Sequence, residues 1–150
     1  MARAPFRHIL TVVDGSESSM AAAKYAIQLA KSCKARLTAV AIVDTATLKR
    51  LLSTQIMVAA EMEEYEQELQ ESGRSHLAYV GGLAKEAGVK CETALLRGAS
   101  HSAVLAEQKE SGADLIVLGA FRWTLAHRDQ IARERQLLLD EAPCPVLVVR

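Results

Sequence analysis

The sequence predicts one α/β domain, a single doubly wound five-stranded parallel sheet with helices on both faces. Three observations predict this class. The chain has 150 residues, the length of one domain, and half of them are apolar, enough for one ordinary core. Short, nearly continuous apolar runs alternate along the chain with longer stretches of helical periodicity. Such runs are typical of strands covered on both faces, and their alternation with helices requires parallel strands joined by right-handed crossovers.

The first two predicted strands follow from apolar runs near the start of the chain. The run Ile9–Val13 ends at a turn signal that begins with Asp14. A helix is expected to start near Ser18 or Ser19, with a serine hydroxyl as its cap. The run Arg36–Val43 predicts a second strand, buried on both faces.

Helix formers dominate the middle of the chain, from Ala46 to about Ala87. They predict a long helix, in which Thr54 and Gly73 are the two candidate positions for a break. Six glutamates and no Lys or Arg lie in Glu61–Glu71, a pattern typical of a solvated helix face.

The remaining elements continue the alternation to the end of the chain. Gly88 is expected to terminate the long helix, because glycine readily adopts the left-handed conformation found after helix ends. Strands are then expected over Val89–Leu96, Asp114–Leu118 and Val146–Val149, and helices over Ser100–Ser111 and Leu125–Glu141. We therefore assign residues 1–150 to one domain.

Composition and charge exclude several classes of function. Eighteen Lys and Arg balance eighteen Asp and Glu, and aromatic residues make up only 4%, which argues against nucleic acid and anionic membranes as partners. No apolar run reaches the roughly 20 residues that cross a bilayer, and no apolar stretch follows the basic N-terminal residues as in a secretory signal. Cys33, Cys91 and Cys144 form no C-x-x-C pair and are expected to be reduced and buried. We therefore expect a cytoplasmic protein.

The fold class also predicts where a ligand would bind. Ligands of doubly wound sheets lie beyond the carboxyl ends of the strands, where the strand order reverses. In this chain the rule selects Asp14, residues 42–44, Gly98 and Gly119.

Three segments resemble the universal stress protein family. They are Ile9–Ser18 (ILTVVDGSES), Gly112–Gly119 (GADLIVLG) and Ala142–Val149 (APCPVLVV). The resemblance in element order covers nearly the whole chain and implies that family's fold, a five-stranded α/β sandwich of the adenine nucleotide alpha hydrolase-like class. It also implies a homodimer, in which the terminal strand with Val146, Leu147 and Val148 pairs antiparallel with its twin. A short apolar edge strand, if left bare, invites such pairing.

Many members of that family bind ATP through a motif of glycine, two residues, glycine, nine residues, then glycine followed by Ser or Thr. Counted from Gly119, the later positions hold Arg122, Ala132 and Arg133, so only the first glycine is present. Glycines let backbone N–H groups approach phosphate without a Cβ in the way. Two alternatives follow. Either the site is closed and no ATP binds, which we favour, or arginine side chains hold an anion instead.

The resemblance assigns two more residues to a nucleotide, if one binds: Asp14 beside the adenosine moiety and Ile42 against adenine. The alternative for Asp14 is that its carboxylate accepts hydrogen bonds from backbone amides of the tight turn. Phe121 and Trp123 are expected to fill volume rather than to stack on a base. Glu134 lies where the family has an apolar residue packing on the sheet, which leaves the start of the last helix open, and pairing with an arginine is an alternative for it.

Catalysis finds little support in the sequence. The four histidines lie in different predicted elements, and neither a Walker-type nor a dinucleotide-binding loop is present. His101 follows Gly98 at the expected ligand edge and is expected to be an exposed residue of a first helical turn. We predict no catalytic residue, no metal and no cofactor, with ATP or another adenine nucleotide as the alternative ligand. A weaker alternative is a hydrolase that uses His101 or Asp14.

These inferences lead to two expected functions. The first is a universal stress protein-like cytoplasmic homodimer that acts in a stress response through an unidentified protein partner, without catalysis or ATP binding. The second is an adenine-nucleotide or anion-binding regulator, with slow ATPase activity as one form of it, in which Arg122 and Arg133 replace the glycine loop. The two differ in whether adenine nucleotide accompanies the purified protein.

Overall fold

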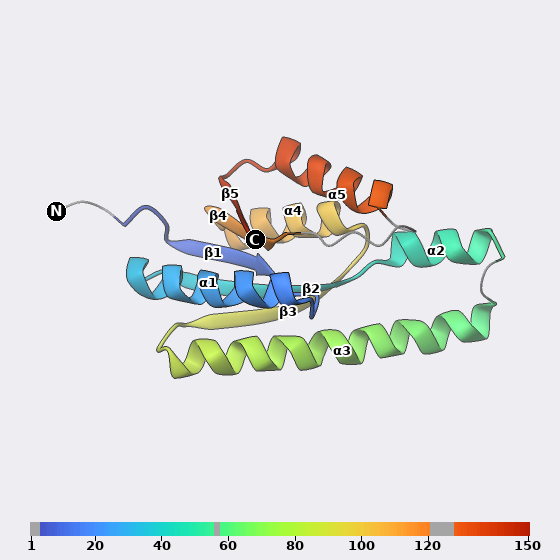
Figure 1. Cartoon of the computed structure of the whole chain (residues 1–150), viewed down its shortest axis with the longest axis horizontal. Helices are drawn as coiled ribbons and strands as arrows, with labels where there is room; N and C mark the ends of the chain where they lie inside the picture. The colour runs from blue at the N-terminus through green and yellow to red at the C-terminus, as the bar shows by residue number, and fades with distance from the viewer. Residues whose placement is uncertain (1–3, 56–57, 121–127) are drawn as a thin grey trace.

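The computed structural model describes residues 4–55, 58–120 and 128–150, apart from the side chains of Thr47 and of residues 128–132. Five strands and five helices lie in this part of the chain (Figure 1). The strands are β1 (His8–Val12), β2 (Arg36–Val43), β3 (Cys91–Arg97), β4 (Leu115–Gly119) and β5 (Val146–Val149). The helices are α1 (Glu17–Cys33), α2 (Thr45–Ser53), α3 (Ala59–Glu86), α4 (Ser100–Ser111) and α5 (Arg128–Glu141).

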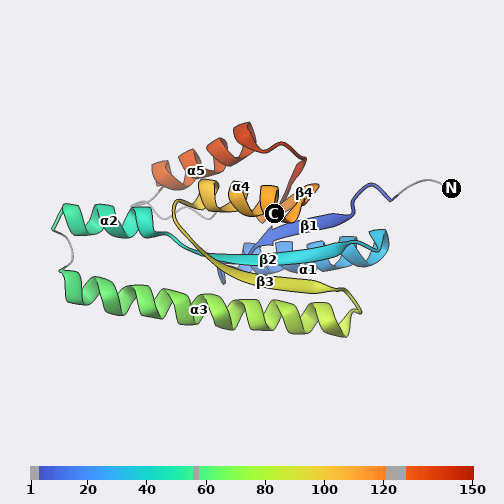
Figure 2. The ribbon, with the colours of Figure 1, turned by 180° about the vertical axis from the view of Figure 1, so that it is seen from behind.

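The strands form one parallel sheet in the order β3-β2-β1-β4-β5. The order reverses between β1 and β4, so the switch point lies beside the central strand. Helices α1 and α3 cover one face of the sheet, and α4 and α5 cover the other (Figure 1 and Figure 2). The predicted fold class, a doubly wound five-stranded parallel sheet, is confirmed.

Each face of the sheet has its own core. On one face, Ala22, Ala23, Ala26 and Ala30 of α1 are fully buried against the strands, and their small side chains let the helix lie close to the sheet. The core of the other face contains Leu10, Val40, Val104, Ala113, Ile116, Leu118 and Leu138. Burying one large aliphatic side chain stabilises a fold by about 1.5–3 kcal/mol. The apolar runs of the sequence therefore hold both helix layers to the sheet.

Helix α1 begins earlier than predicted. Its N-cap is Ser16 rather than Ser18 or Ser19, because the Ser16 Oγ accepts a hydrogen bond from the Ser19 backbone N–H at 3.1 Å. The Ser18 hydroxyl donates instead to the carbonyl of Ala120 at 2.5 Å, which ties α1 to the end of β4. The sequence alone could not distinguish neighbouring serines, since each is a suitable cap.

The long helical stretch is divided near Thr54, as predicted, but not at Gly73. Helix α2 ends at Ser53, and α3 then runs unbroken for 28 residues. Gly73 is buried, and a Cβ there would lie 2.8 Å from Leu95 Cδ1 and 3.3 Å from Ala41 Cβ. The glycine therefore permits close packing of α3 on β2 and β3 rather than a kink.

The other predicted boundaries are correct or shift by one or two residues. Helix α4 and strand β5 have the predicted limits, and β1, β3 and β4 are displaced slightly. The predicted start of the last helix at Leu125 lies outside the described residues, and the described helix begins at Arg128. Gly88, with φ of 77°, follows the end of α3 as predicted.

Helix α3 extends with α2 beyond the carboxyl edge of the sheet (Figure 2). Five of its six glutamates in the segment 61–71 are exposed, as predicted for a solvated face, and the half-buried Glu66 pairs with Arg97 of β3. In the described part of the chain, no helix combines the length and the apolar character needed to cross a membrane.

Candidate functional site

A pocket of about 150 Å³ lies at the carboxyl edge of the sheet, where the sequence predicts a ligand site. It is enclosed by the ends of β1, β2 and β4, by the start of α4 and by α5. Its lining residues are Val12, Val13, Asp14, Ile42, Ser100, His101, Val104, Leu118, Glu134, Arg135 and Leu138. The pocket is thus mainly aliphatic, with a few polar groups at one side.

The predicted site residues divide between the pocket and its surroundings. Asp14 and Ile42 line the pocket, whereas Gly119 and Arg133 do not, and the Arg133 side chain is exposed on α5. Arg122 lies outside the described residues, as do Phe121 and Trp123.

Asp14 has a structural role in the turn after β1. Its Oδ1 accepts a hydrogen bond from the Ser16 backbone N–H at 2.8 Å, and its own N–H donates to Ser19 Oγ at 3.2 Å. The bond to the Asp14 carboxylate is of the kind expected if Asp14 stabilises the tight turn. The carboxylate is exposed and also borders the pocket, so the turn role leaves it accessible to a ligand.

Gly119 is required by packing between β4 and α1. A Cβ at this position would lie 2.5–2.6 Å from backbone atoms of Ser18 and Ser19. Those atoms are backbone and cannot turn away, so any larger residue would push the start of α1 off the sheet. The glycine that the ATP motif shares with this chain therefore has a structural explanation here.

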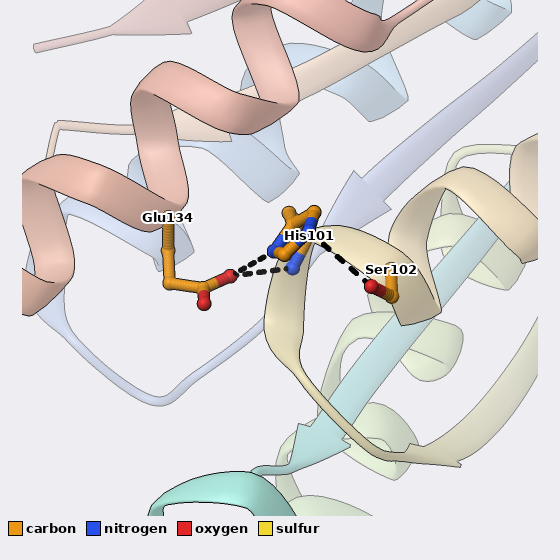
Figure 3. Close-up of polar contacts among 3 residues, drawn as sticks. All are labelled: His101, Ser102 and Glu134. Atoms are coloured by element: carbon orange, nitrogen blue, oxygen red, sulfur yellow. Dashed lines mark hydrogen bonds and ion pairs between the residues drawn. The ribbon is translucent and has the colours of Figure 1, made fainter.

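Glu134 of α5 and His101 of α4 join these two helices, as Figure 3 shows, and both residues line the pocket. Glu134 Oε2 accepts hydrogen bonds from the backbone N–H of His101 at 2.9 Å and from its Nδ1 at 2.5 Å. Both side chains are only about one-fifth exposed. The expectation that His101 is exposed is therefore wrong, because its side chain is half-buried, and in the ion pairs of the described residues Glu134 has this histidine, not an arginine, as its partner.

The Glu134 carboxylate occupies the start of α4. The N-cap residue of that helix, Ala99, has no side chain that could accept the free N–H groups of the first turn. A helix N-terminus favours negative charge, because its unpaired N–H groups and dipole point outward. Glu134 supplies that charge from α5, so the helix end already holds an anionic group.

The same cluster places a hydroxyl after the imidazole. Ser102 Oγ lies 3.3 Å from His101 Nε2, so carboxylate, imidazole and hydroxyl follow in the order of an activated serine (Figure 3). Ser102 is exposed and does not line the pocket. The backbone N–H of His101 is already bonded to Glu134. The geometry explains the orientation of His101 but directs no nucleophile into the pocket.

Among its described lining residues, the pocket has two carboxylates, Asp14 and Glu134, and one guanidinium, Arg135. Arg135 has a further interaction of its own and is not a free cation. Among the residues that the structure describes, no group of three His, Cys, Asp or Glu side chains is placed to hold a metal ion. The sequence pattern predicts Asp14 as a site residue but not Arg135, because nothing in the local pattern indicates which face of α5 turns toward the pocket.

The thiols lie apart from the pocket. All three cysteines are free and half-buried, somewhat less buried than expected. Burial raises the pKa of the Cys91 thiol and of the Cys144 thiol, which disfavours the reactive thiolate.

Comparison with known sequences supports the resemblance read from the three segments. The model of the universal stress protein family matches residues 5–150. A universal stress protein of Methanocaldococcus jannaschii is 32% identical over 145 residues, which cover 97% of this chain and 82% of the relative. The universal stress protein YxiE of Bacillus subtilis is 29% identical over 147 residues, covering 97% and 99% of the two chains.

Solved structures show the same fold. A universal stress protein family structure from Burkholderia pseudomallei has a TM-score of 0.73 at 26% identity and covers 95% of this chain and 94% of its own. A universal stress protein in complex with cAMP has a TM-score of 0.69 at 22% identity, with 97% of each chain covered. The universal stress protein of Archaeoglobus fulgidus in complex with dAMP has a TM-score of 0.67 at 13% identity, covering 98% and 99%.

Proposed function

The chain belongs to the universal stress protein family, and on that basis we propose that it is a non-catalytic cytoplasmic homodimer that does not bind ATP. Family membership supports a role in the stress response. In the proposed role the dimer acts by contacting a protein partner and uses no cofactor.

The observation that carries the proposal is the Glu134 carboxylate in the pocket. Together with Asp14 it gives the described lining two carboxylates against the one guanidinium of Arg135, and it already accepts the His101 backbone N–H at the α4 N-terminus. Two unit charges about 4 Å apart repel by about 4 kcal/mol in the effective dielectric near a protein surface. A triphosphate placed beside Glu134 would meet this repulsion and would have to displace the carboxylate from its N–H donors.

The chain's departures from the ATP motif support the same conclusion. Arg122, Ala132 and Arg133 stand where the family motif has two glycines and a hydroxyl residue. The one retained glycine, Gly119, is explained by its packing against α1. The exposed position of Arg133, outside the pocket lining, also gives no support to a guanidinium that replaces the hydroxyl.

The direct test is extraction of the purified protein with acid, followed by chromatography of the released small molecules. We expect no adenine nucleotide and no change in unfolding temperature with millimolar ATP. Stoichiometric adenine nucleotide in the extract would contradict the proposal.

A variant at Glu134 tests the proposed reason. Glu134→Gln keeps the size of the side chain and removes its charge, so the repulsion of phosphate is lost. We expect the variant to gain an ATP-dependent rise in unfolding temperature, measured by differential scanning fluorimetry. Asp140→Asn, which removes one exposed acidic charge from the same helix, is the control and should gain none. Equal gains in both variants would show that general charge, not Glu134, excludes ATP.

The second candidate function is binding of an adenine nucleotide without a triphosphate. It is favoured by the solved relatives in complex with cAMP and dAMP, and by the aliphatic pocket next to Asp14 and Ile42. Calorimetric titration with AMP and with adenosine distinguishes it from the first proposal. Binding of either that is weakened by Ile42→Arg would favour this second function.

A further inference from the structure

We propose that a groove between the carboxyl-terminal ends of α1 and α3 binds a compact polyanion that carries several phosphate groups. The groove lies at the amino edge of the sheet, opposite the pocket, so the inference does not rest on the proposed function. Figure 1 shows the two helix ends together at the left, where β2 and β3 begin. The volume of the groove is about 400 Å³. It is lined by Ala30, Lys31, Lys34, Ala35, Arg36, Ala87, Gly88, Val89 and Lys90.

Basic side chains dominate this lining. Lys31, Lys34 and Lys90 are exposed, and none of the described residues that line the groove with them is acidic. In the described part of the chain, none of the three ammonium groups forms an ion pair. Arg36 is a fourth basic lining residue, but its guanidinium is directed to His8, with Nη2 3.4 Å from His8 Nδ1.

The helix ends do not neutralise these lysines. Lysine is common near helix C-termini, because each end carries roughly half a negative charge. Two helices, α1 and α3, end at the groove, which amounts to about one negative charge against three ammonium groups. About two positive charges therefore remain in excess. Lys85 and Glu86, which precede the groove on α3, balance each other.

Lys34 adds an independent observation. It adopts the left-handed conformation, with φ of 55° and ψ of 38°, at a helix end where glycine is usual. A lysine in this conformation is strained relative to glycine, and such strain is common where a side chain is positioned for function. The conformation places the Lys34 side chain at the groove.

The backbone restricts the class of ligand. At the end of α1 the N–H groups of Lys34 and Ala35 bond to helix carbonyls, and at the end of α3 those of Gly88 and Val89 do the same. An anion must therefore be held by the side chains, which are compact, separate point charges. A molecule with several phosphates can place a separate phosphate on each of several ammonium groups, so it suits three lysines better than a single phosphate does. The neutral overall charge disfavours a long nucleic acid, which would track along an extended basic surface.

The test is calorimetric titration of the full chain with inorganic tripolyphosphate at low salt. We expect saturable binding that weakens as salt is added, and at least tenfold weaker binding of orthophosphate. The triple variant Lys31→Gln, Lys34→Gln, Lys90→Gln should lose at least tenfold in affinity. The matched control, Lys24→Gln, Lys49→Gln, Lys109→Gln, removes the same charge from exposed positions on α1, α2 and α4 and should change affinity by less than about twofold. Undetectable binding to the wild type, or equal losses in both variants, would overturn the proposal.

Lys34→Gly provides a second test, in which a loss of tripolyphosphate binding cannot result from unfolding. Glycine relieves the left-handed strain, so we expect the unfolding temperature to rise by about 2–4 °C while affinity for tripolyphosphate falls severalfold. Unchanged affinity in this stabilised variant would overturn the assignment of Lys34. Poly-glutamate that binds the groove more tightly than tripolyphosphate would identify an acidic protein segment as the occupant and would also overturn the proposal. Because Glu134 is on the opposite edge, failure here leaves the ATP test unaffected.

Discussion

At the scale of single residues, the largest difference between expectation and structure concerns Glu134 and His101. In the sequence, Glu134 is a polar residue where the family has an apolar one, and His101 belongs to the first turn of a helix. Neither pattern predicts a contact between them. Together they form a carboxylate–imidazole contact at the start of α4, and this contact holds the Glu134 carboxylate at the pocket. The residues are 33 positions apart, so only packing of α5 on α4 brings them together.

His8 is a buried titratable group at the other edge of the sheet. Its Nδ1 faces the Arg36 guanidinium, which can only donate, so Nδ1 is the acceptor and Nε2 carries the hydrogen directed to Thr38 Oγ1 at 2.6 Å. Burial lowers the pKa of His8 below its usual value of 6.5, and the nearby charge of Arg36 lowers it further. The imidazole is therefore held neutral in the folded protein.

This arrangement predicts that stability falls with acidification. The unfolded chain takes up the His8 proton first, because its pKa lies above the native one. The contribution of His8 is thus complete above pH 6.5 and is lost as the pH falls toward the lowered native pKa. In urea unfolding at pH 8 and pH 5, we expect His8→Gln to lose less stability on acidification than the wild type.

A control variant separates titration from packing. Thr38→Val removes the hydroxyl that contacts the imidazole but leaves the titrating group, so the pH dependence should persist. If His8→Gln and the wild type lost equal stability between the two pH values, the neutral state of His8 would not explain the acid sensitivity.

At the scale of elements, α1 depends on a set of serines. Ser16 caps the helix, Ser18 reaches β4, and the Ser19 hydroxyl donates to the Ser16 carbonyl at 3.1 Å. The N-terminus of α1 is thus fixed both to its own turn and to the neighbouring strand.

The capping assignment predicts unequal effects of alanine in this segment. Ser16→Ala removes the acceptor of the Ser19 N–H and should lower the free energy of unfolding by about 1 kcal/mol, the usual cost of a lost N-cap. Gln28→Ala, a substitution at an exposed position of the same helix that leaves the cap in place, should change it by less than about 0.5 kcal/mol. Chemical denaturation of both variants measures the difference. A smaller loss for Ser16→Ala than for Gln28→Ala would show that another group caps α1.

At the scale of the whole molecule, β5 is an edge strand. The carbonyls of Pro145 and Val149 accept bonds from β4. In a parallel ladder, alternate residues direct their polar groups to the same neighbour, so Val146 and Val148 direct theirs away from β4. Those free N–H and C=O groups suit antiparallel pairing with a second copy, which supports the proposed homodimer.

The dimer proposal predicts a selective effect of proline. Val148→Pro removes an outward N–H and leaves the β4 ladder intact, so it should yield a folded monomer. Val148→Thr keeps the N–H and should stay dimeric. Sedimentation velocity at several concentrations measures the assembly, and circular dichroism checks the fold. A monomeric wild type, or a Val148→Pro variant that dimerises as tightly as the wild type, would contradict pairing through β5.

The fold class, the edge of the sheet that carries the pocket and the family all follow from patterns in the sequence. These rest on local patterns: apolar runs and helical periodicity define elements, and the parallel sheet places every strand's carboxyl end at one edge. Asp14 and Ile42 were found in this way, since each directly follows or ends a strand.

Contacts between residues that are distant in the sequence depend on how the elements pack. The contact of Glu134 with His101, the packing need for Gly119 and the lysine groove between two helix ends all join segments far apart in the chain. Local sequence patterns define which face of an element is buried, but the distance and rotation between packed elements depend on the fit of all their side chains together. For that reason the sequence located the pocket, while the structure decided its charge and placed a second basic groove at the opposite edge.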